Sequence, residues 1–125
     1  NDVTIIAFSI MVGKSLEAAE ILKDKNIDAE VINLRTLRPL DIDTIIESVK
    51  KTNRVVTCEE GFPFSGIGAE ISALITEKAF DWLDAPVVRV TGKDVPMPYA
   101  ANLEKLALPQ VDDIVGACAQ VCYKD

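Results

Sequence analysis

The sequence predicts an α/β protein, in which helices cover both faces of a mainly parallel β-sheet. Two observations lead to this prediction. Strand-like and helix-like segments alternate along the whole chain. The strand-like segments are nearly continuous runs of Val and Ile, which is typical of parallel strands buried on both faces. Right-handed crossovers between parallel strands then restrict how such a sheet can wind.

Each element has a local signal. Apolar runs of strand length predict strands, and apolar residues at a helical spacing predict helices. Arg38-Pro39 ends the second strand, and Asp41 is a good N-cap for the helix that follows. The strands are expected over residues 3–8, 30–34, 54–58 and 87–90. Helices are expected over residues 12–23, from residue 42 onward, from residue 67 toward Trp82, and over residues 111–121. The second of these helices has an apolar stripe at Ile42, Ile45, Ile46 and Val49.

Composition narrows the class of protein. With 125 residues and 49% hydrophobic residues, the chain is expected to form one domain, residues 1–125, with its own core. The 13 basic and 20 acidic residues give a net charge of −7, which argues against a nucleic-acid-binding surface. No apolar run approaches 18 residues, so no membrane span is expected, and no targeting segment is visible.

Three Cys and no His limit the possible chemistry. A catalytic scheme that uses His is excluded, and a metal site would need more ligands. Cys118 and Cys122 lie four residues apart on one face of the closing helix. We expect them to be reduced and to serve as small buried apolar residues.

Glu59-Glu60 follows the third strand, where open α/β sheets bind ligands. The two carboxylates are candidates for positioning a substrate or for acid–base work. Adjacent residues in an extended segment point in opposite directions, however, so the favoured interpretation is a solvated, loop-capping or subunit-contacting pair.

The loop over residues 61–68 superficially has phosphate-loop spacing, but Ile67-Gly68 stands where Lys and Ser or Thr are required. As a dinucleotide fingerprint it also fails, because Ile71 replaces the third Gly. An anion at the helix N-terminus stays open. We favour an apolar contact between subunits, made by Phe62 and Phe64.

The most specific stretch is residues 83–109, LDAPVVRVTGKDVPMPYAANLEKLALP. Together with residues 15–20, 30–41, 59–63 and 66–71, in the same order, it resembles the closing domain of a family of beta subunits. These are the beta subunits of the pyruvate dehydrogenase component in the 2-oxo acid dehydrogenase complexes. They belong to the transketolase-like, thiamine-diphosphate-dependent enzymes, and the resemblance covers essentially the whole chain.

The resemblance implies a three-layer α/β/α fold like the transketolase C-terminal domain. It implies four parallel strands here in the order 2-1-3-4, with the second strand near an unpaired edge. A fifth, antiparallel strand of that fold would precede the present chain, which would then be one domain of a larger subunit.

For function, the resemblance implies an enzyme that decarboxylates pyruvate and acetylates the lipoyl group of an acyltransferase core. Thiamine diphosphate and magnesium would be bound outside this domain, so no catalytic, cofactor-binding or metal-binding residue is assigned to it, and the isolated domain would be inactive. The partners would be an alpha subunit and a second beta subunit in a heterotetramer. The expected location is the mitochondrial matrix, with the bacterial cytoplasm as the alternative.

Asp84 is the candidate for partner binding. In the related beta subunits this end of the domain docks the small, basic subunit-binding domain of the acyltransferase, and an acidic anchor would steer that encounter. Asp84 is expected in a turn beside Arg89. The alternative, that Asp84 hydrogen-bonds the backbone of its own turn, stays open.

Two other functions stay open. The lack of His, of a metal set and of an intact phosphate motif is consistent with a free-standing binding or regulatory module of the same fold. A relative that acts on acetoin or branched-chain acids is the other alternative. The segment Met97-Pro98-Tyr99 argues against it, because branched-chain members of the family favour His near Tyr99 and differ around Met97. Trp82 is expected to be half buried.

Overall fold

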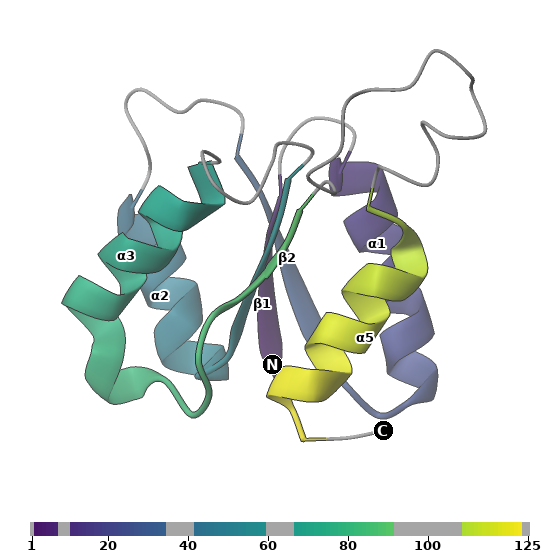
Figure 1. Ribbon diagram of the computed structural model, residues 1–125. Helices are drawn as coiled ribbons and strands as arrows, with labels where there is room; N and C mark the ends of the chain where they lie inside the picture. Colours follow the sequence, from purple (N-terminus) through teal and green to yellow (C-terminus); the bar gives the residue numbers. More distant parts are fainter. Residues whose placement is uncertain (1, 8–10, 35–41, 60–66, 92–108, 124–125) are drawn as a thin grey trace, which may run out of the picture.

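The computed structural model describes residues 2–7, 11–34, 42–59, 67–91 and 109–123, and shows the predicted alternation of strands and helices (Figure 1). The strands are β1 (Val3–Ala7), β2 (Ala29–Asn33), β3 (Val55–Cys58) and β4 (Val88–Val90). The helices are α1 (Met11–Asp24), α2 (Ile42–Thr52), α3 (Ile67–Ala79) and α5 (Val111–Val121), and the short 3-10 helix η1 spans Phe80–Trp82. The strand and helix boundaries predicted from the sequence are confirmed to within a residue or two.

The four strands form one parallel sheet in the order β2-β1-β3-β4. This confirms the predicted order, with β2 at one edge of the described sheet and β4 at the other. β1 lies in the middle and all five of its residues are buried, whereas the residues of β2 are only partly buried or exposed. The central strand is therefore the most protected from water, as its unbroken apolar sequence predicts.

Helices cover both faces of the sheet, with α1 and α5 on one side and α2 and α3 on the other (Figure 1). Successive residues of β1 point to opposite faces, so that Ile5 belongs to the core under α1 and α5, and Ile6 to the core under α2 and α3. The fold is thus the three-layer arrangement that the sequence predicts. In the described part of the chain, no helix is both long and apolar enough to cross a membrane.

A buried hydroxyl network ties α2 to the sheet. The Thr4 hydroxyl of β1 lies 2.8 Å from the Ser48 hydroxyl and 2.7 Å from the Thr52 hydroxyl, and Thr52 Oγ1 donates to the Arg54 carbonyl at 3.0 Å. All three hydroxyl-bearing residues are buried. Because each hydroxyl has a partner, the polar atoms are kept inside the core at little cost. The network fixes the junction between α2 and β3.

Candidate functional site

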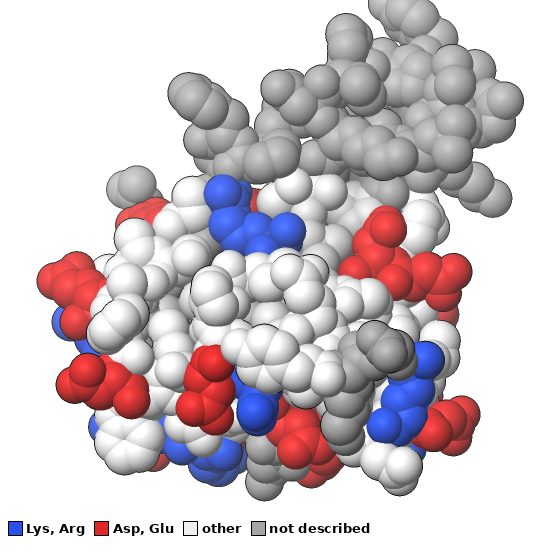
Figure 2. Space-filling model, turned by 60° about the horizontal axis from the view of Figure 1, so that its bottom comes forward, with Lys and Arg blue, Asp and Glu red and all other residues white. Residues whose placement is uncertain are grey.

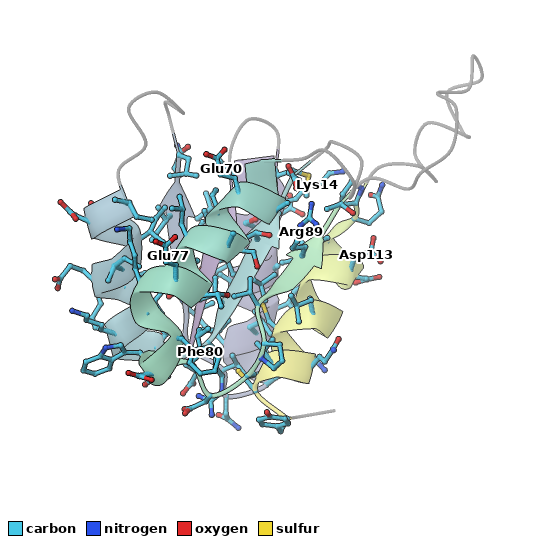
Figure 3. The ribbon with its side chains drawn as sticks, turned by 60° about the vertical axis from the view of Figure 1, so that its left-hand side comes forward. Lys14, Glu70, Glu77, Phe80, Arg89 and Asp113 are labelled. Atoms are coloured by element: carbon cyan, nitrogen blue, oxygen red, sulfur yellow. The ribbon has the colours of Figure 1, made fainter. Side chains whose placement is uncertain are left out.

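A buried ion pair lies at the end of the sheet where the parallel strands reach their carboxyl termini, called here the carboxyl edge. Glu59, directly after β3, is only 2% exposed, and its Oε1 lies 3.3 Å from Nη2 of Arg89 on β4, labelled in Figure 3. The Glu59 backbone N–H also donates to the Val90 carbonyl at 3.0 Å. Glu59 therefore joins two neighbouring strands. Of the interpretations that the sequence favoured, solvation is wrong for Glu59, which is buried, and Glu60 lies outside the described residues.

Sequence reasoning missed this pair because its partners are 30 residues apart. The register of the parallel strands places Arg89 opposite Thr57 and Val90 opposite Cys58, so the guanidinium can reach past the end of β3. One signal was available. Arg89 is a charged residue inside a Val-rich strand, and a charge in such a place needs a partner.

Burial keeps the thiols of Cys58 and Cys118 in their neutral form. Cys58 and Cys118 are fully buried, which confirms the expectation for Cys118, and Cys122 is partly buried. Burial raises the pKa of Cys58 to about 12 and also raises the pKa of Cys118. Neutral, buried thiols are poor nucleophiles and poor metal ligands. Within the described segments, no cluster of His, Cys, Asp and Glu could hold a metal ion.

Asp84 lies at the opposite, amino edge of the sheet, in the turn that leads into β4. Its backbone N–H donates to the Asn53 carbonyl at 2.8 Å, and its carbonyl accepts a hydrogen bond from the Tyr123 hydroxyl at 3.1 Å. Its side chain is 57% exposed, and Oδ2 lies 3.7 Å from Nη2 of Arg54. The expected neighbour was wrong: Arg89 pairs with Glu59, and Asp84 pairs with Arg54.

The turn that carries Asp84 is held from two helices. Asn53, after α2, adopts a positive φ of 63°, and its side-chain amide donates to the Trp82 carbonyl at 2.6 Å. Arg54 Nε donates to the carbonyl of Val121 in the last turn of α5 at 3.1 Å. Trp82 is about half exposed, as predicted, with the Lys50 ammonium 5.5 Å from its ring centroid. The Asp84 carboxylate thus projects from a fixed frame.

Charge around this end of the molecule is mixed. Figure 2 looks onto the amino edge and shows acidic and basic groups interspersed around a white, uncharged area. A single-sign field would be expected for a nucleic-acid surface. The mixed pattern on this face suits a surface on which individual charges set the register of a protein partner.

Two surface grooves accompany the sheet edges in the described part of the chain. The first, called here the α3–β4 groove, has a volume of about 490 Å³ and is lined by Ser72, Thr76, Phe80, Leu83, Asp84, Ala85, Pro86 and Val87. The second, the α1–β2 groove, has a volume of about 460 Å³ and is lined by Leu16, Glu17, Ala19, Glu20, Lys23, Ala29 and Val31. The α3–β4 groove contains Asp84, so the candidate anchor and a hollow surface are adjacent. Phe62, Phe64 and Tyr99 lie outside the described residues.

Comparison with known proteins identifies the relatives of this chain. The sequence profile of the family described as "Transketolase, C-terminal domain" matches residues 1–114. The chain is 63% identical over 124 residues to the "Pyruvate dehydrogenase E1 component subunit beta-1, mitochondrial" of Oryza sativa subsp. japonica, covering 99% of this chain and 33% of the relative. It is 62% identical over 123 residues to the "Pyruvate dehydrogenase E1 component subunit beta" of Rickettsia bellii, covering 98% of this chain and 38% of the relative.

The structural comparison agrees. A solved structure titled "Split gene transketolase, inactive beta4 tetramer" superimposes with a TM-score of 0.83 at 33% sequence identity, covering 98% of this chain and 38% of that one. The chain thus spans about a third of the length of its relatives, and its similarity extends over nearly all of its own residues. On these grounds the chain belongs to the transketolase C-terminal domain family, and its curated relatives are beta subunits of the pyruvate dehydrogenase E1 component.

Proposed function

We propose that this chain is the C-terminal domain of the beta subunit of a pyruvate dehydrogenase component. The observation that carries the proposal is the 63% identity to the rice beta subunit over 99% of the chain. The parent assembly would decarboxylate pyruvate and transfer the acetyl group to the lipoyl group of an acyltransferase. It would contain an alpha subunit and a second copy of the beta subunit.

In this proposal the chemistry takes place outside the domain. Thiamine diphosphate, with magnesium, would be bound by other parts of the assembly and would supply the electron sink for decarboxylation. The described residues support this division. Glu59 at the carboxyl edge is engaged by Arg89, and the neutral thiols of Cys58 and Cys118 are sealed in the core. The domain would therefore contribute subunit contacts and a docking face, and would be inactive alone.

Asp84 is proposed as an anchor of that docking face. Its carboxylate is more than half exposed, and its backbone is fixed on both sides by Asn53 and Tyr123. A rigidly presented carboxylate loses little freedom when it pairs with a base, which favours binding to a basic subunit-binding domain. Phe62 and Phe64 are proposed as the apolar contact with a neighbouring subunit.

The proposed location is the mitochondrial matrix. The names of this chain's relatives in rice, Arabidopsis thaliana and Dictyostelium discoideum describe them as mitochondrial, which supports this location. The Rickettsia relatives are bacterial proteins, so the bacterial cytoplasm remains the alternative.

A substrate assay tests the proposed reaction. The complete subunit that contains this domain is co-expressed with its alpha subunit, and decarboxylation is followed with an artificial electron acceptor. We expect activity that depends on thiamine diphosphate and prefers pyruvate over branched-chain 2-oxo acids. A preference for branched-chain acids or acetoin, or no activity with any of them, would contradict the proposal.

A titration tests the role of Asp84. In the assembled enzyme, Asp84→Asn is expected to lower the affinity for the subunit-binding domain about tenfold and to reduce the salt dependence of binding, because a charge pair is lost. Decarboxylation without the acyltransferase should not change. Asp43→Asn, an exposed Asp at the start of α2, is the matched control. Equal affinity of the Asp84 variant and the wild type would remove the docking role.

A further inference from the structure

We draw no further inference here: the strongest candidate, the α1–β2 groove beside the edge strand β2, carries none, because nothing in the described part of the chain shows what covers it, and a strand from the chain ahead of residue 1 would restate an established property of the family fold.

Discussion

Replacing Arg89 with Met removes the counter-charge of a buried carboxylate. The Glu59 side chain is 3% exposed and its Oε1 lies 3.3 Å from Arg89 Nη2, so the variant leaves a charged group in the interior that must be hydrated or protonated. Breaking such a pair typically costs 3–5 kcal/mol, and because the Arg89 side chain is 25% exposed we expect about 2 to 4 kcal/mol. That loss is a large share of the stability of an ordinary domain.

Urea unfolding of the chain, followed by circular dichroism, measures the free energy of unfolding. The double variant Glu59→Gln/Arg89→Met should be more stable than Arg89→Met alone, because it leaves no buried charge. Lys78→Met removes an exposed base and should change stability by less than about 0.5 kcal/mol. If Arg89→Met lowers stability as little as this control, then Glu59 is open to solvent. In that case the carboxyl edge would again be a candidate ligand-binding site.

Four further predictions concern the core and the turn. Thr4→Val should lower the free energy of unfolding by about 1–3 kcal/mol, because the buried Ser48 hydroxyl loses its partner and the Thr52 hydroxyl keeps only its bond to the Arg54 carbonyl. Thr76→Val at an exposed position should have no such effect, and a chemical denaturation series compares the two. At pH 8, iodoacetamide should leave Cys58 and Cys118 unmodified in the native protein, as read by mass spectrometry. Folding raises the pKa of Cys58 from 9.0 to about 12, so above pH 9 the thiol ionises first in the unfolded state. The contribution of this thiol to stability is therefore complete below pH 9 and is lost as the pH rises toward 12. A melting temperature that stays constant over this pH range would contradict the burial of Cys58. Asn53→Ala should lower the melting temperature more than Asn53→Gly, because Gly tolerates the positive φ of this position and Ala does not.

The fold was predictable because its local and global signals agree. The continuous apolar run of β1 predicts a central strand, and the structure buries all five of its residues. The stripe that begins at Ile42 predicts α2, and its inward residues Ile45 and Val49 are buried. Strand order came from the family resemblance, since alternation alone does not fix which strands are neighbours.

The candidate sites were less predictable because their partners are distant in sequence. Glu59 meets Arg89 only through the register of β3 and β4, which no local pattern encodes. Asp84 was correctly expected in a turn, but its ion-pair partner Arg54 comes from the neighbouring strand entry rather than from Arg89. The exposed ring of Phe80 carried no sequence signal, since an apolar residue near a helix end is normally buried.

We propose that this domain makes subunit contacts and docks a partner, while the chemistry takes place in other parts of the assembly, including another domain of the same subunit. Intact-mass measurement and tandem mass sequencing of the native polypeptide test it most directly. Because the chain spans 33% and 38% of its rice and Rickettsia relatives, we predict a polypeptide about three times as long, with a thiamine-binding domain ahead of residue 1. A native polypeptide of 125 residues that begins at Asn1 would contradict the claim, and the free-standing binding module would take its place.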